Sequence, residues 1–351
     1  MIYLSFIFYF LIVQSYSLES RNIRRPLDTS VPIITVTATD PELQKSWNIV
    51  AKNPTPEKKE YRLKSNFLQL RPIKKGFNQE FFKEAYLPSG VLVFRDKSGF
   101  VNTSILSQLA NELVEEIKTG HQKFTHFDIL KDRDFNYTTL SGLIVAKYKD
   151  YPFVIKLSIE HPHTMVQPFS KSFETDFIFI LGGNLRHLSN FTRIENLKNI
   201  KSILRYNPAF VDSIDFPRKW YWKPNVSHDL KIIWSCNGVT DEMYLPSVYA
   251  TISDFIKTDK IQPQQELNKI AMKVAIDTGF LIDPHAGNFV IEQDTGGVVL
   301  LDTENFRMMT GIDQCMKAKK YFAWYVELAN NCLYKYFMRS KQERLDQCTL
   351  V

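Results

Sequence analysis

The sequence predicts an α+β fold on three observations. Hydrophobic residues make up 44% of the 351 positions and aromatic residues 13%, which suits a substantial buried core and argues against a disordered chain. Short runs of β-branched and aromatic residues, typical of strands, cluster between residues 127 and 157. Stretches with apolar residues at helical spacing lie before and after that cluster. A chain of this length indicates two domains, or one two-lobed domain with extensions.

Residues 1–17 have the pattern of a secretory signal peptide. Residues 2–13 are nearly all apolar or aromatic, and no charge appears before Glu19. Ser15 and Ser17 supply small residues at the −3 and −1 positions of a cleavage site. The pattern predicts export to a secreted, periplasmic or lumenal location.

A membrane anchor formed by residues 2–18 is the alternative interpretation. The usual positive charge before the apolar run is missing and three arginines follow it, so the positive-inside rule favours an anchor with its N-terminus outside. At about 12 residues, however, the run is short for a membrane-spanning helix. A buried N-terminal element is the third interpretation. Only the anchor interpretation implies a membrane tether.

The net charge of +6, from 44 basic and 38 acidic residues, does not indicate a polyanionic partner. The excess is spread along the chain, so we expect a solvated surface and no nucleic-acid partner. In an exported protein the four cysteines allow three disulfide pairings; they are Cys236, Cys315, Cys332 and Cys348. Four sequons for N-glycosylation are present, at Asn102, Asn136, Asn190 and Asn225.

Two segments are expected to precede the main domain. Residues 18–61 are rich in Pro, Thr, Lys and Glu and predict a poorly ordered linker, with one strand-like run at 31–36. Residues 62–123 predict an accessory region packed on the core. It contains a hairpin at 90–101 and an amphipathic helix that ends at Gly120.

The rest of the chain, residues 124–351, predicts strands followed by helices. Strands are expected at 127–130, 141–149, 153–157 and 230–234, and around Trp220 and Trp222. Helices are expected at 168–181, 245–256, 264–277 and 312–345, and a turn or hinge at 236–238.

One loop and the hairpin behind it carry the chemical signal. Residues 283–288 read DPHAGN, and two short apolar strands at 289–291 and 298–301 then lead to Asp302. Because a hairpin brings its two ends together, Asn288 and Asp302 should lie side by side. Phosphoryl transfer needs such a set: one carboxylate to take the acceptor's proton, and a carboxamide with a carboxylate to hold Mg²⁺.

The order of these motifs resembles the protein-kinase-like superfamily over about 230 residues. The DPHxGN and LLD sequences are most similar to the atypical kinases that include the coenzyme-Q-biosynthesis kinases, and aminoglycoside and choline kinases share the looser spacing. The resemblance implies a two-lobed kinase-like domain over residues 124–351, with a reduced C-lobe and an N-terminal extension. It also implies ATP and Mg²⁺ as cofactors.

The resemblance assigns roles to the residues of the loop and hairpin. Asp283 would be the catalytic base, and Asn288 and Asp302 would bind the metal and nucleotide. Glu304 would give a second metal contact or would be solvated. His285 would hydrogen-bond the loop backbone.

A lysine on the third strand would complete the site. Lys156 lies between apolar residues in a strand and resembles the lysine that contacts the nucleotide phosphates in the family. The family pairs that lysine with a helix glutamate, for which Glu174 is the first choice and Glu195 the second. An edge-strand lysine that points into water is the alternative reading of Lys156.

Two features depart from the family pattern, and one pair of histidines does not indicate a metal site. Residues 131–140 occupy the place of the phosphate-covering loop but contain no glycine, and two aspartates there would repel phosphate unless they point away. The 49 residues after Asp302 lack an APE-like element, which leaves little room for a protein-substrate platform. The pair His161 and His163 is expected to be solvated.

The sequence therefore predicts an ATP- and Mg²⁺-dependent phosphotransferase that acts on a hydroxyl of a small molecule, lipid or protein. A catalytically inactive pseudokinase that serves as a binding module is the alternative, because the 131–140 loop lacks glycine and ATP is scarce outside the cytosol. Nucleotidyl transfer on the same fold is a third interpretation.

Overall fold

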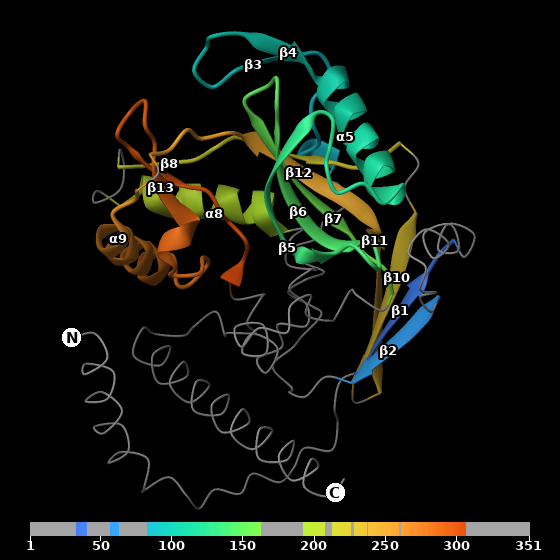
Figure 1. Cartoon of the computed structure of the whole chain (residues 1–351). Coiled ribbons are helices and arrows are strands. Elements are labelled where there is room, and N and C mark those ends of the chain that lie inside the picture. Colours follow the sequence, from blue (N-terminus) through green and yellow to red (C-terminus); the bar gives the residue numbers. More distant parts are fainter. Residues whose placement is uncertain are drawn as a thin grey trace, which may run out of the picture.

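The structure is a computed structural model, and it confirms a mixed α+β fold (Figure 1). It describes residues 33–40, 57–62, 83–162, 192–207, 213–225, 228–236, 238–259 and 261–306. In these ranges the strands form four separate sheets, and three α-helices pack against them.

A five-stranded antiparallel sheet forms the centre of the described structure. Its strand order is β5-β6-β7-β12-β9. The strands are β5 (Phe127–Asn136), β6 (Ser141–Tyr148), β7 (Phe153–Ile159), β12 (Val248–Asp254) and β9 (Lys219–Trp222). The strands predicted in 127–157 and around Trp220 are confirmed.

The helix predicted at 245–256 is wrong, because this stretch ends one strand and forms another. Strand β11 (Val239–Pro246) ends there, and β12 follows as the strand between β7 and β9. Six of the seven residues of β12 are buried, so its continuous apolar run reflects burial on both faces rather than a helical period. The turn predicted at 236–238 connects two paired strands, β10 and β11.

Helix α5 (Thr103–Lys118) covers one face of the central sheet. The side chain of Asn102 caps it by accepting a hydrogen bond from the backbone N–H of Ser104 at 3.0 Å. Its buried face shares one hydrophobic core with β6, β7 and β12. The hydroxyl of Tyr148 on β6 also donates to the carbonyl of Leu106 at 3.2 Å. Helix α5 is therefore packed on the sheet, as predicted. The predicted hairpin is present as β3 (Val91–Val93) and β4 (Phe100–Asn102).

The opposite face of the same sheet carries two lysines. Side chains alternate between the faces of a strand, so Lys156 points away from Ile155 and Leu157, which are in the α5 core. Val154 shares the face of Lys156 and pairs with Ser253, and Ser253 pairs in turn with Lys219 on β9. The register thus places both lysines on the face that α5 does not cover.

A second packed unit surrounds the loop at 283–288. It contains helix α8 (Arg193–Arg205), helix α9 (Gln264–Asp277), the 3₁₀ turn η3 (Ala286–Asn288) and the hairpin of β13 (Phe289–Ile291) and β14 (Val298–Leu300). The buried faces of both helices and the hairpin share a hydrophobic core. Strand β8 (Ile214–Asp215) pairs with β14 in parallel. The helix predicted at 264–277 and the hairpin after it are confirmed.

Part of the expected linker is paired in a sheet instead. Strand β1 (Ile33–Ala38) pairs with β2 (Lys58–Arg62) and with β10 (Asp229–Cys236), in the order β11-β10-β1-β2. The prediction of a poorly ordered linker over residues 18–61 is therefore wrong for these two strands. The composition of this segment did not predict the pairing, because the partner strand β10 lies about 190 residues further along the chain.

Several predictions lie outside the described residues, among them the signal or anchor segment and the helices at 168–181 and 312–345. Within the described ranges, no helix has the length and hydropathy needed to cross a membrane.

We expect Leu113→Ala to lower the free energy of unfolding by about 2–5 kcal/mol, because it would leave a cavity where α5 meets the sheet. Leu113 is fully buried, whereas Leu130 on β5 is 52% exposed, so Leu130→Ala is the control, with an expected change within about 0.5 kcal/mol. Urea unfolding would measure both. Equal losses in the two variants would contradict the packing of α5.

Candidate functional site

The loop that follows α9 is held in shape by its own hydrogen bonds. The imidazole Nδ1 of His285 accepts from the backbone N–H of Gly287 at 2.9 Å, which confirms the predicted backbone contact of this histidine. The backbone N–H of His285 donates to the carbonyl of Asp283 at 2.8 Å. The backbone N–H of Ala286 donates to the side-chain oxygen of Asn268 on α9 at 3.2 Å. The loop is thereby fixed to the helix that precedes it.

The hairpin brings Asn288 next to the segment that contains Asp302. The backbone N–H of Leu301 donates to the carbonyl of Asn288 at 2.8 Å. The side-chain amide nitrogen of Asn288 donates to the carbonyl of Asp283 at 3.1 Å. The carboxamide oxygen, which is the atom that would bind a metal, takes no part in that bond. The three predicted residues of the loop and hairpin therefore lie in one region.

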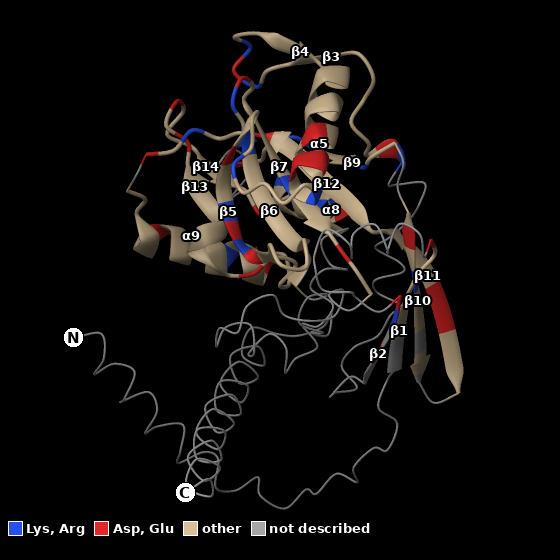
Figure 2. Ribbon diagram, turned by 45° about the vertical axis from the view of Figure 1, so that its right-hand side comes forward, with Lys and Arg blue, Asp and Glu red and all other residues tan. Residues whose placement is uncertain are grey.

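Asp302 is held by two basic side chains from distant parts of the chain. Its Oδ2 lies 3.1 Å from the ammonium of Lys156, and its Oδ1 accepts a hydrogen bond from Nη1 of Arg193. The lysine and the aspartate were both predicted site residues, and the structure brings them together across 146 positions. Lys156 therefore does not point into water. Figure 2 shows basic and acidic positions together near α8, β7 and β12.

Glu304 also pairs with Arg193. Its Oε2 accepts from Nη2 of Arg193 at 2.7 Å, and its side chain is 9% exposed. The expectation that Glu304 might be solvated is wrong, because the guanidinium draws this carboxylate into the interior. Arg193 is 5% exposed and thus bridges two carboxylates inside the protein.

A third cation, Lys219, contacts the same segment. Its ammonium donates to the carbonyl of Leu301 at 2.6 Å and to the hydroxyl of Thr303 at 2.9 Å. That hydroxyl donates in turn to the carbonyl of Arg193 at 2.7 Å. The side-chain amide of Asn196 on α8 adds hydrogen bonds to the carbonyls of Leu281 and Thr303, at 2.8 and 3.0 Å. Helix α8, strand β9 and residues 301–304 are therefore joined by a buried polar network.

We call Lys156, Arg193, Lys219, Asp302 and Glu304 the charge cluster. With all five groups ionised, three cations and two anions leave one net positive charge. An excess positive charge in a largely buried setting is suited to an anionic ligand such as a polyphosphate.

The environment shifts the pKa of the groups in the cluster. Burial acts to raise the pKa of Asp302, but the charges of Arg193 and Lys156 outweigh it and hold that pKa well below 3.8. The pKa of Lys219 lies well below 10.5, because of burial and then the charge of Lys156. Burial also lowers the pKa of Lys156, although Asp302 opposes that shift. The surroundings thus disfavour the charged form of both lysines, and a bound anion would favour it.

The predicted glutamate partner of Lys156 is not found among the described residues. Glu174, the first choice, lies outside them. Glu195, the second, lies on α8 near Tyr221, whose pKa it acts to raise. The charges that act on Lys156 are those of Asp302, Arg193 and Glu304. In the described structure, α8 presents an arginine rather than a glutamate to this site.

Sequence reasoning missed Arg193 and Lys219. The alternation of Lys219 with Trp220 and Trp222 in a short strand was the available signal for Lys219, since it predicts one polar face. Arg193 gave no local signal, because its role depends on carboxylates 109 and 111 positions away.

The expected phosphate-covering loop is shorter than its sequence suggested. Strand β5 continues through Asn136, so Lys131 and residues 134–136 pair with β6, with two register shifts. The two aspartates are engaged within the hairpin: Asp132 accepts from the hydroxyl of Tyr137 at 2.9 Å, and Asp134 lies 2.6 Å from the ammonium of Lys131.

The glycine of this hairpin lies after the turn. At Gly142, with φ +122°, a Cβ would lie 2.2 Å from the carbonyl oxygen of Asp134, so glycine is required for the close approach of the two strands.

His161 is buried, so the expectation of solvated histidines is wrong for this residue. It lies two residues after the end of β7. The backbone N–H of Glu160 donates to the carbonyl of Ser247 at 2.8 Å, so the pairing with the neighbouring strand continues beyond β7. His163 lies outside the described residues.

The candidate metal ligands of this region are oxygen donors. The described residues contain no group of three or more His, Cys, Asp or Glu side chains arranged to hold a metal. A phosphate-bound Mg²⁺ needs only one or two carboxylates beside the phosphates, and the oxygens of Asn288, Asp302 and Glu304 are the hard donors that it prefers. This donor set fits Mg²⁺ chemically.

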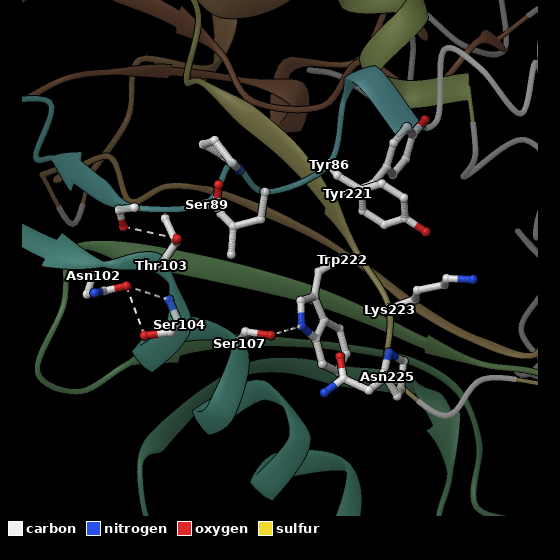
Figure 3. Close-up of a pocket in the computed structure, with 14 residues that line it drawn as sticks. Tyr86, Ser89, Asn102, Thr103, Ser104, Ser107, Tyr221, Trp222, Lys223 and Asn225 are labelled. Atoms are coloured by element: carbon white, nitrogen blue, oxygen red, sulfur yellow. Dashed lines mark hydrogen bonds between the residues drawn. The ribbon is translucent and has the colours of Figure 1, made fainter.

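A separate cavity of about 480 Å³ lies at the start of α5 (Figure 3). Tyr86, Asn102, Ser104 and Trp222 are among its lining residues, and the indole N–H of Trp222 donates to the hydroxyl of Ser107 at 2.9 Å. None of the predicted site residues lines this cavity.

Comparisons of the chain with models of protein families, with curated proteins and with solved structures give no match.

Asp302→Asn should lower the free energy of unfolding at neutral pH by roughly 3 kcal/mol, because it leaves buried cations without their counter-charge. The folded-state pKa of Asp302 is below its ordinary value, so its contribution is present above about pH 4 and is lost as the pH falls through the lowered pKa.

Urea unfolding between neutral and acidic pH would test this. The difference between wild type and Asp302→Asn should be constant above about pH 4 and shrink below it. Asp128→Asn, an exposed change on β5, is the control and should show no comparable loss. A difference that is unchanged under acidic conditions would contradict the role given to the ion pairs.

Proposed function

We propose that this protein is an ATP-dependent phosphotransferase with a two-lobed kinase-like fold, acting on a hydroxyl of a small molecule, lipid or protein. The observation that carries the proposal is the 3.1 Å ion pair between Lys156 and Asp302. The resemblance assigns both residues from separate motifs, Lys156 as the phosphate-contacting lysine of a strand and Asp302 as the metal-binding aspartate after the hairpin, 146 positions apart. A shared site was the consequence that the resemblance required.

The order of the elements also supports the proposal. Along the chain, the strands of the antiparallel sheet come first, and helix α8 follows β7 and precedes β9. A connecting segment, helix α9 and the DPHAGN loop come after the sheet. The hairpin of β13 and β14 then leads to Asp302. This is the succession that the resemblance implies for a strand-rich upper lobe, a hinge and a catalytic loop. In this interpretation the hinge lies at 255–263.

The residues of the chain would divide the work as follows. The ammonium groups of Lys156 and Lys219 and the guanidinium of Arg193 would attract and orient the phosphates. Asp283 would accept the proton of the acceptor hydroxyl as its oxygen forms a bond to the γ-phosphorus and the bond to ADP breaks. Asn288 and Asp302 would hold Mg²⁺, which supplies charge neutralisation of the phosphates when bound.

A pseudokinase that binds nucleotide without turnover is the second candidate. The specific observation in its favour is that Arg193 occupies both carboxylates that a catalytic metal would use. Nucleotidyl transfer would use the same groups and would differ in the product, because AMP rather than phosphate would be attached to the acceptor. Export through the N-terminal segment, or a membrane tether there, remains part of the proposal.

A transfer assay with γ-labelled ATP, with water and the protein itself as acceptors, tests the proposed function. Asp283→Asn should reduce ADP release by about 10²–10⁴-fold, because the general base is lost. It should leave ATP binding, measured as a thermal shift, unchanged. Asp277→Asn is the matched control, since Asp277 is an exposed carboxylate at the end of α9, six positions before Asp283.

The outcomes separate the candidates. Binding of ATP without ADP release from wild type would favour the pseudokinase, and AMP attached to protein in mass spectra would favour nucleotidyl transfer. The absence of a thermal shift at millimolar ATP would contradict all three.

A further inference from the structure

Arg193 occupies the place in the charge cluster where a divalent cation would be expected. Its two terminal nitrogens contact different carboxylates: Nη1 contacts Oδ1 of Asp302 and Nη2 contacts Oε2 of Glu304 at 2.7 Å. A planar guanidinium can donate from its two terminal nitrogens to two different carboxylates, so it is suited to such a bridge. A metal that bound Oδ1 of Asp302 or Oε2 of Glu304 would compete with the guanidinium for that oxygen.

The carboxylate of Asp302 is engaged on both oxygens. Oδ2 lies 3.1 Å from the ammonium of Lys156, and Oδ1 also accepts from the backbone N–H of Glu304 at 3.1 Å. A divalent cation that approaches Asp302 therefore displaces a hydrogen-bonded partner. It also enters next to Arg193 and Lys156, whose positive charges repel it.

Arg193 is held at its backbone as well as at its guanidinium. The carbonyl of Arg193 accepts from the hydroxyl of Thr303 at 2.7 Å, and Asn196, one turn further along α8, bonds the carbonyl of Thr303 at 3.0 Å. The backbone of α8 is thus attached to the segment that carries both carboxylates. Arg193 is 5% exposed, so this position is built into the packed structure.

We propose that Arg193 is a resident cation of this site. A nucleotide binds through its phosphates to Lys156, Lys219 and Arg193 without a divalent cation. Mg²⁺ enters only in exchange for Arg193 at Asp302 and Glu304. The identity of the ligand as a nucleotide rests on the proposed function, while the exchange at the carboxylates rests on the contacts described above.

The first experiment uses the wild-type chain alone. Isothermal titration with ATP is performed once in EDTA and once with saturating Mg²⁺. The dissociation constants should agree within about threefold, because the protein already supplies the cation. ATP binding that is lost in EDTA and restored by Mg²⁺ would overturn the resident-cation proposal and leave the proposed function standing. No ATP binding under either condition would reject the proposed function itself.

The second experiment measures Mn²⁺ binding by electron paramagnetic resonance, with no nucleotide present. Arg193→Gln should bind Mn²⁺ at least about tenfold more tightly than wild type, because it releases two carboxylates and removes a repelling charge. Arg205→Gln is the matched control: Arg205 is an exposed arginine in the last turn of the same helix, and its loss should leave Mn²⁺ affinity unchanged. Equal affinities in wild type and Arg193→Gln would overturn the proposal.

A double variant guards against misfolding of Arg193→Gln. The pair Arg193→Gln with Glu304→Gln removes the guanidinium together with one of its two carboxylates, so less uncompensated charge stays buried. It should still bind Mn²⁺ more tightly than wild type, through Asp302 and Asn288. In either variant, added Mn²⁺ should raise the melting temperature by several degrees, whereas wild type should show no shift. A wild-type shift equal to that of the variants would count against the exchange.

Discussion

The ion pairs of Asp302 are the interaction on which the arrangement of the site depends. Lys156 reaches the aspartate from the central sheet, and Arg193 reaches it from α8. Residues 301–304 therefore connect the sheet, the helix and the hairpin that carries Asn288. Removing charges from water is costly, and such a cluster is stable only when hydrogen bonds satisfy its members. Lys219 donates to the carbonyl of Leu301 and the hydroxyl of Thr303, and Asp302 accepts from the backbone N–H of Glu304, which supplies part of that satisfaction.

The cluster has more basic than acidic side chains, and this imbalance links stability to ligand binding. Three basic side chains share two carboxylates, and burial and the charge of Lys156 disfavour the charged form of Lys219. An arrangement that is unfavourable without a ligand becomes favourable when an anion enters, because the anion then stabilises the folded state by mass action. The same logic explains why a single structure can suit both a transferase and a binding protein. The cations attract phosphate in either case, and turnover depends on what occupies Asp302.

The two faces of the central sheet allow a charged site and an apolar core to lie close together. The period of two along β7 directs Ile155 and Leu157 to the core under α5, and Lys156 to the other face. Helix α5 thus stabilises the sheet from the side away from the charge cluster. The accessory helix can contribute to rigidity without contributing a group to the site.

The sequence by itself determined the parts of the site that are local. Asn288 and Asp302 are joined by a short hairpin, so spacing alone predicted that these two lie together. The place of Lys156 beside them was predicted only by the resemblance to the kinase-like superfamily. The tertiary structure decided the rest. Strand β12 resembled a helix because burial on both faces erases the period of two, and β1 was expected only as a strand-like run within a linker because its partner is remote. Arg193 became a site residue only through contacts with carboxylates more than 100 positions away, which no local pattern records.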